Sequence, residues 1–295
     1  MKKNLETEWR TRMEMSRATK TWWGFDPKKQ PFSNTIEEAS GLFVWDAFDE
    51  CVEDVVEAVL KRKFLCLIGP PCAAKSTCWA EAARRLRERK GIFHLASPLG
   101  LEPQAYSEPT IYLTLREAIA PESDPLRRMR EERAAQCRRM LMRCNDAKQP
   151  VVLTINDAHA CKGEFLLTLK RLWDNLDGLD RLLSVLLIGH SGLTAKVGQI
   201  KEINQRSEVL HVPPLGTAIP NYLQHECARC GLKDFPFDDS ALDELDKLRN
   251  DAVPEAANDH PLFVNLVAAA ALSEAHRLKQ RTINHDIITK AVTKI

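Results

Sequence analysis

The stretch LCLIGPPCAAKSTCW, residues 65–79, limits the fold of this chain more than any other feature of its sequence. Gly69-Pro70-Pro71-Cys72-Ala73-Ala74-Lys75-Ser76 matches the phosphate-loop pattern G-x-x-x-x-G-K-[ST] at every position except Ala74. An apolar segment of strand length precedes the loop, and WAEAARRLRERKG, which has helical character, follows it. The pattern therefore predicts a strand, a tight loop and a helix that binds a polyphosphate at its N-terminus.

The residue types of this loop suit a nucleotide with Mg²⁺. The loop from Gly69 to Thr77 would surround the phosphates with the N–H groups of its non-proline residues, Lys75 would neutralise the β/γ oxygens, and Ser76 would hold the metal ion. The missing glycine matters because position 74 calls for permissive torsions and a close backbone approach. Two alternatives stay open: a chance strand-turn-helix, and a loop that no longer binds nucleotide. We expect binding of ATP and Mg²⁺.

Strands and helices are predicted to alternate along the first two thirds of the chain, which indicates an α/β fold with a doubly wound, parallel, five-stranded sheet. The predicted strands are FLCLIG, Ile111–Leu115, Val151–Ile155, Ser184–Gly189 and Val209–Leu215. Helices are expected at 42–61, from the loop to Gly91, at 125–144 and at 163–177. Beyond Leu215 the pattern is wholly helical, as in a small lid. We therefore divide the chain into an arm with an aromatic segment (1–35), a nucleotide-binding core (36–215) and a helical lid (216–295).

Composition excludes several classes of protein. Hydrophobic residues make up 44% of the 295 residues and charged residues 28%, as is usual for globular proteins, and the net charge of +1 gives no global attraction to nucleic acid or membrane. The longest apolar runs have the length of strands, so no membrane span is expected. Nine scattered cysteines without a signal peptide suggest reduced thiols and a cytoplasmic location.

A second half of the site is predicted where VVLTINDAHA leaves its strand. ATPases of this type often end that strand in Asp-Glu, where the first carboxylate organises Mg²⁺ and the second polarises the attacking water. If Ala158-His159 fixes the alignment, Asn156 takes the metal-organising position and Asp157 the catalytic one. An uncharged amide and a shorter carboxylate predict slow hydrolysis. The alternative is that these residues form only a turn at the strand end.

Four further motifs carry a family resemblance. WWGFDPKKQPFSNT resembles an aromatic entry segment, INDAH resembles I-D-E-A-H, LLIGHSGL resembles L-V-G-Q-P-E-L, and QIKEINQRSEVLHVPPL resembles a stretch in which an arginine precedes the final strand. Over nearly its full length the chain resembles the AAA+ ATPases of the ExeA, TnsC, TniB and MuB group.

The resemblance implies roles for two more residues and reveals one departure. It places His190 at the polar first-sensor position and makes Arg206 the candidate finger for a neighbour's γ-phosphate; the alternatives are a structural histidine and a surface arginine. Where the family often has Gly-x-Pro-Arg, this chain has Asn258-Asp259-His260-Pro261-Leu262, so the second-sensor arginine is absent. This departure also argues for slow hydrolysis.

The resemblance further implies a function. It predicts an ATP-dependent, DNA-binding regulator of transposition that forms a ring or helical homo-oligomer on duplex DNA and recruits or activates a transposase, with a targeting protein as a further partner. Phosphate contacts would make DNA binding independent of base sequence, and the arginine-rich stretch from 127 to 143 is either a solvated face or a source of such contacts. The alternatives are a non-catalytic scaffold that binds nucleotide structurally and an ExeA-like secretion ATPase, which would need a membrane helix and a periplasmic domain.

Overall fold

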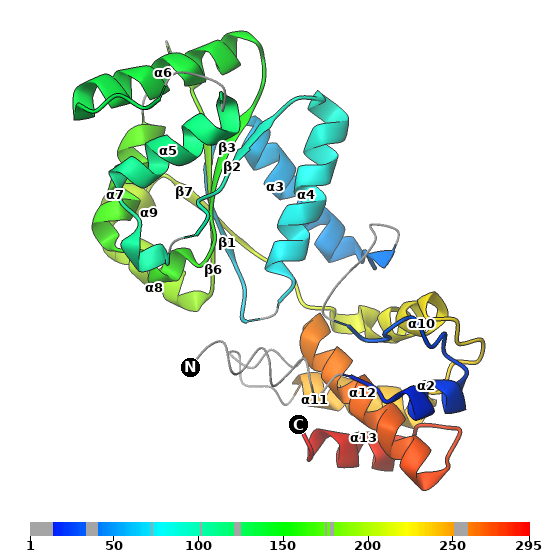
Figure 1. Cartoon of the computed structure of the whole chain (residues 1–295). Helices are drawn as coiled ribbons and strands as arrows, with labels where there is room; N and C mark the ends of the chain where they lie inside the picture. The colour runs from blue at the N-terminus through cyan, green and yellow to red at the C-terminus, as the bar shows by residue number, and fades with distance from the viewer. Residues whose placement is uncertain are drawn as a thin grey trace. The chain divides into compact units, whose positions relative to one another are not determined.

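The described part of the chain forms two compact units. The computed structural model describes residues 14–33, 41–71, 73–100, 102–120, 125–174, 176–177, 180–250 and 259–295. The first unit is drawn from Met1–Asp46, Cys72–Ala74 and Pro213–Ile295, and the second from Ala47–Pro71 and Lys75–Val212. Figure 1 labels the elements of both.

The second unit is built on a parallel five-stranded sheet in the order β2-β3-β6-β1-β7. Its strands are β1 (Phe64–Ile68), β2 (His94–Ala96), β3 (Val151–Ile155), β6 (Ser184–Gly189) and β7 (Ser207–His211). The predicted α/β class with a five-stranded parallel sheet and a helical C-terminal part is confirmed.

Helices cover both faces of this sheet (Figure 1). One face carries α3 (Asp46–Leu60) and α4 (Lys75–Lys90). The other carries α5 (Glu108–Ile119), α6 (Arg130–Asp146), α7 (Gly163–Trp173), α8 (Ser191–Gln199) and α9 (Lys201–Asn204). Short 3₁₀ turns lie at Pro103–Ala105 and Ala158–Ala160, and β4 (Leu176–Asp177) pairs antiparallel with β5 (Asp180–Arg181).

The central strands are apolar except for Thr154 and Ser184 because both of their faces are buried. Alternate residues such as Phe64, Cys66 and Ile68 of β1 join the core beneath α5, α6, α7 and α8. Leu65 and Leu67 point to the opposite face and are fully buried there. A strand buried on both faces fixes the backbone at its carboxyl end, where the loop begins.

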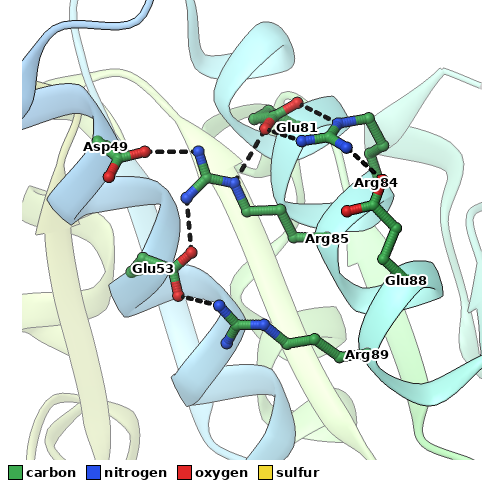
Figure 2. Close-up of polar contacts among 7 residues, drawn as sticks. All are labelled: Asp49, Glu53, Glu81, Arg84, Arg85, Glu88 and Arg89. Atoms are coloured by element: carbon green, nitrogen blue, oxygen red, sulfur yellow. Dashed lines mark hydrogen bonds and ion pairs between the residues drawn. The ribbon is translucent and has the colours of Figure 1, made fainter.

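A network of ion pairs joins α3 to α4, the helix that begins in the phosphate loop (Figure 2). The Arg85 guanidinium donates to Asp49 (2.5 Å), Glu53 (2.5 Å) and Glu81 (2.9 Å). Arg84 also pairs with Glu81, whose side chain is only 7% exposed. The hydrogen bond from Arg84, aided by Arg85, holds the pKa of Glu81 below its usual value. The network therefore links a buried carboxylate of α4 to the surface of α3.

The predicted strand at Ile111–Leu115 is wrong, because these residues lie in α5. Ser107 and Thr110 form a capping box, and a proline in the first turn suits a helix start. Ile111, Tyr112 and Leu115 are buried with helical spacing, so packing overrides the β propensity of the IYLTL run. The second strand is instead β2, whose three residues pair with β3.

Several boundaries also differ from the predicted ones. The last strand spans Ser207–His211 instead of Val209–Leu215, and the arginine-rich helix begins at Arg130 instead of Pro125. The β4–β5 hairpin was not predicted. The C-terminal helices were predicted in the correct order. The domain limits 1–35, 36–215 and 216–295 stay a prediction.

The first unit consists of helices and an aromatic segment. Its helices are α2 (Arg17–Trp23), α10 (Ile219–Arg229), α11 (Asp239–Asn250), α12 (Pro261–Leu278) and α13 (His285–Val292), with a 3₁₀ turn at Gly216–Ala218. The aromatic segment is helical as far as Trp23. The Trp23 indole N–H donates to Leu272 O (3.0 Å), and Phe25 and Phe32 are buried. The arm at residues 1–13 lies outside the described residues.

A buried carboxylate ties α12 to the C-terminal end of the chain. Glu274 is 4% exposed and accepts from Arg277 and Lys294. The Arg277 hydrogen bond, followed by that of Lys294, lowers the pKa of Glu274 to about 2. Within the described part of the chain, no helix combines the length and apolar character needed to cross a membrane.

Candidate functional site

The predicted site residues other than Arg206 follow three neighbouring strands at the carboxyl edge of the sheet. The loop from Gly69 follows β1, Asn156 follows β3, and His190 follows β6. β6 lies between β3 and β1, so the three segments leave adjacent strands. The N–H of Gly69 donates to the carbonyl of Gly189 (3.2 Å), which ties the start of the loop to the residue before His190. Ligands of parallel α/β sheets bind at this edge.

Ala74 takes the backbone conformation that the missing glycine would take. Its φ is +59°, in the left-handed region that glycine enters without steric cost. Alanine occupies this region at a cost of about 1 kcal/mol because of its Cβ. The loop thus has the backbone turn that the phosphate-loop pattern requires, with a small strain in place of the glycine.

The Lys75 ammonium group lies over the loop. It donates to the carbonyl oxygens of Gly69 (3.0 Å) and Pro70 (2.6 Å), while its own residue begins α4. Ser76 is exposed in the first turn of that helix, where N–H groups lack intrahelical acceptors. A cation, a hydroxyl and a helix N-terminus are therefore gathered at one loop. Cys72, also predicted to bind the cofactor, lies outside the described residues.

Asn156 and Asp157 form a turn where β3 ends. Both side chains are exposed, and Asp157 has a φ of +50°, a conformation that Asp adopts more readily than most residues. The turn leads at once into the 3₁₀ turn at Ala158–Ala160. This geometry agrees with a metal-organising and catalytic pair and also with a simple turn at the strand end. The roles of Asn156 and Asp157 in metal organisation and catalysis stay predictions.

His190 is held in one orientation by its neighbours. It caps α8, and its Nδ1 accepts the N–H of Gly192 (3.0 Å), so the neutral imidazole carries its proton on Nε2. A Cβ at position 192 would lie 2.7 Å from His190 Cε1, which explains why a glycine stands there. The ring of His159 packs against that of His190, tilted by 39°, with centroids 3.7 Å apart. His190 is therefore a donor of fixed tautomer at the carboxyl edge.

Two contributors to this edge were not predicted from the sequence as site residues. His159 served only to align the INDAH motif, yet its ring packs on His190. Lys196 of α8 donates to the carbonyls of His159 and Cys161 (2.6 Å each) and so fixes the segment after β3. Only the fold, which places β3 beside β6, brings these residues together.

Arg206 lies at the opposite edge of the sheet from the loop. It precedes Ser207, which pairs with Phe64 at the start of β1, whereas the loop follows Ile68 at the end of β1. Five residues of strand separate the two edges by about 16 Å. An arginine side chain does not extend that far, so Arg206 cannot reach the loop of its own subunit. Instead its Nη1 donates to Asp174 (2.8 Å), and its side chain is 52% exposed.

The residues at the carboxyl edge fit a nucleotide with Mg²⁺. Ala74 supplies the required left-handed turn, Lys75 the cation, and Ser76 and Asn156 oxygen atoms of the kind that Mg²⁺ prefers. A phosphate group could replace the two loop carbonyls as the partner of Lys75 and would gain a charge-assisted contact.

A family model described as an AAA domain matches this part of the chain. The match covers residues 59–197. It contains the loop, the β3 turn and His190, and it ends before Arg206. No curated protein is significantly similar to the chain in sequence.

Solved structures share the fold. The Cdc6p protein of Pyrobaculum aerophilum has a TM-score of 0.57 at 14% identity, covering 90% of this chain and 70% of that chain. The ORC2 protein of Aeropyrum pernix, solved in ADPNP–ADP complexes, has a TM-score of 0.56 at 14% identity, with 89% and 71% covered. The Aeropyrum pernix ORC1 protein in complex with DNA has a TM-score of 0.51 at 13% identity, with 88% and 68% covered.

Proposed function

We propose that this chain is an ATP-binding regulator of DNA transposition that oligomerises on duplex DNA and recruits or activates a transposase. The observation that carries the nucleotide-binding part is the left-handed turn at Ala74 followed by Lys75 at the start of α4. The DNA-binding part draws support from a similar structure solved with DNA. The transposition part rests on the resemblance to the TnsC, TniB and MuB group.

Each residue of the edge has one task in this proposal. The bound ATP–Mg²⁺ supplies a polyphosphate charge that bridges subunits and a γ-phosphate open to hydrolysis. Lys75 and the N–H groups of the loop bind the phosphates, Ser76 and Asn156 hold the metal ion, and Asp157 orients water. His190 offers its Nε2–H group as a hydrogen-bond donor at this edge. Because Asn156 adds no charge, hydrolysis is slow and assemblies persist.

The arginine-rich helix is the proposed contact surface for DNA phosphates. Residues 125–150 contain eight basic and three acidic residues, a surplus of five positive charges, whereas the rest of the chain carries an excess of four negative charges. Cys137 and Leu141 of α6 are buried, while Arg139 and Arg143, one turn apart, are exposed. Exposed arginines one turn apart on a helix suit a phosphate backbone.

A scaffold that binds nucleotide structurally is the second candidate. It is favoured by Asn156, which lacks the negative charge of the usual metal-organising carboxylate, and by the absence of the second-sensor arginine from the sequence. The two candidates differ in phosphate release and in DNA binding, so the same purified protein distinguishes them.

The test is duplex-DNA binding with and without ATP and Mg²⁺, imaged by negative-stain microscopy at two salt concentrations. The regulator predicts ATP-dependent rings or filaments that fall apart at the higher salt. Lys75→Ala should abolish them, and filaments like those of the wild type from this variant would refute the interface model. A folded protein that binds no DNA and shows no nucleotide effect would favour the scaffold.

A double variant tests the α6 surface. Arg139→Gln with Arg143→Gln should reduce the slope of log affinity against log salt by about 2, because each phosphate contact contributes about 0.9. Arg89→Gln, which removes an arginine of α4 from outside this surface, is the matched control and should leave the slope unchanged. An unchanged slope in the double variant would exclude α6 as the contact surface.

A further inference from the structure

A single carboxylate at the end of α7 binds three cations. Asp174 Oδ1 accepts from Arg206 (2.8 Å) and Arg181 (2.9 Å), and its Oδ2 accepts from Lys170 (2.5 Å). The Asp174 side chain is 24% exposed. Lys170 lies on α7 and Arg181 on β5, both close to Asp174 in sequence, whereas Arg206 comes from the segment before β7.

Two of the cations fix the carboxylate in place. The Arg181 guanidinium stacks over the Trp173 ring at 3.9 Å and also donates to the Trp173 carbonyl (3.2 Å). Lys170 is 13% exposed and lies one turn before Asp174 on α7. Partial burial alone would raise the pKa of Asp174, but the hydrogen bond from Lys170 and the nearby positive charges lower it. Asp174 is thus an ionised acceptor of fixed position.

Arg206 uses only part of its donor set on this acceptor. Its Nη1 binds Asp174, and within the described part of the chain its Nε and Nη2 make no hydrogen bond. Because a guanidinium is a rigid planar fork, a bond at Nη1 sets the direction of the other donors. The half-exposed side chain therefore presents a second donor edge in a fixed direction.

The cluster also carries excess positive charge. Three cations share Asp174, and the second carboxylate nearby, Glu202, lies 3.8 Å from Lys170 and is 63% exposed. Together the side chains of Lys170, Asp174, Arg181, Glu202 and Arg206 therefore carry one net positive charge. An anion brought to this surface would be attracted while Asp174 retains Arg206.

We propose that Asp174 is a positioning residue that holds Arg206 as a receiving site for the terminal phosphate of the nucleotide bound by a second copy of this chain. This inference rests on the proposed function, because the phosphate belongs to a neighbouring subunit in the assembly. The inference adds that Arg206 depends on Asp174 for its orientation. Loss of the Asp174 carboxylate would leave Arg206 in place without a fixed direction.

The test measures the ATP concentration that gives half-maximal assembly on duplex DNA, by mass photometry, for single and double variants of the full chain. Arg206→Ala and Asp174→Asn should each raise this concentration about tenfold, as expected for losing one charge-assisted contact. The double variant should be no worse than Arg206→Ala alone, because Asp174 acts only through Arg206. Glu202→Gln is the matched control: it removes a carboxylate from the same cluster without breaking the contact between Asp174 and Arg206, so it should not raise this concentration.

Two further variants separate positioning from a structural role. Asp174→Glu keeps the charge and should restore assembly to within about threefold of the wild type. Arg206→Lys keeps the charge but lacks the fork, so it should resemble Arg206→Ala, and this result stands even if Asp174→Asn fails to fold. Monomer binding of a fluorescent ATP analogue should be the same in all folded variants.

The possible outcomes are distinct. If the wild type assembles but Asp174→Asn equals it, or if the losses in the double variant add, the positioning role is overturned and the proposed function stands. If Arg206→Lys assembles as the wild type does, the directional use of the fork is overturned. If the wild type shows no assembly that depends on ATP, the proposed function fails and the inference fails with it.

Discussion

Replacing Arg85 by methionine should destabilise the second unit more than any other single arginine replacement on α4. Methionine keeps the apolar stem but removes the guanidinium that binds Asp49, Glu53 and Glu81 (Figure 2). Arg85 is 16% exposed, so these contacts are largely shielded from water. Because α4 begins at the phosphate loop, its position on α3 also bears on the site.

The expected fall in the free energy of unfolding depends on which partners each carboxylate keeps after Arg85 is replaced. Removing one partner of a fully buried pair costs about 3–5 kcal/mol, and an exposed pair contributes about 0.2–1 kcal/mol. Glu81 is 7% exposed but keeps Arg84, Glu53 keeps Arg89, and Asp49 is half-exposed. The free energy of unfolding should therefore fall by about 2–3 kcal/mol, between the two limits.

Hydrogen exchange of the β1 and β3 amides measures this change, because the core strands of a unit exchange through its global opening. Arg89→Met is the matched control: Arg89 is 45% exposed and makes one ion pair, so its loss should cost about 0.5 kcal/mol. Equal effects of the two replacements, or a loss of less than about 1 kcal/mol in Arg85→Met, would show that burial does not determine how much these ion pairs contribute to the free energy of unfolding.

Three further predictions concern other residues. Ala74→Gly should leave the free energy of unfolding within about 0.5 kcal/mol, since relief of strain offsets glycine's freedom in the unfolded chain, whereas Ala74→Val should lower it by about 2 kcal/mol in urea titration; equal effects would contradict the left-handed turn. Gly192→Ala should shift the His190 ring and slow phosphate release about tenfold with unchanged ATP affinity, and an unaltered rate would remove His190 from the site. Because the folded-state pKa of Glu274 is depressed to about 2, its contribution of about 1 kcal/mol should be present above pH about 4.5 and be lost as the pH falls through 2; a gap in the free energy of unfolding between wild type and Glu274→Gln that is as large at pH 2 as above pH about 4.5 would contradict this.

The loop and its surroundings could be predicted because the residues that specify them are close together in sequence. An apolar strand, the spacing from Gly69 to Lys75 and the helix that follows are contiguous, and strands buried on both faces leave a clear apolar run. The conformation of Ala74 follows from the same pattern, since every other position of the loop matches it. These features needed no knowledge of tertiary contacts.

The errors arise where tertiary packing decides the structure. The IYLTL run has the residues of a strand, yet its capping box and buried face make it α5, while β2, at His94–Ala96, is too short to leave a periodic signal. The contact between the rings of His159 and His190 depends on the pairing of β3 with β6. Of the three cations around Asp174, Lys170 and Arg181 are near it in sequence, and only the fold brings Arg206 to it.

The central claim is that a loop with alanine in place of glycine still binds ATP through Lys75. Isothermal titration of the purified chain with ATP and Mg²⁺ tests it directly, with Lys75→Ala as the comparison. The account predicts saturable binding of one nucleotide per chain, weakened at least tenfold in Lys75→Ala, as expected for the loss of a charged phosphate contact. A folded wild-type protein that binds no nucleotide, or binds it as well without Lys75, would contradict the account.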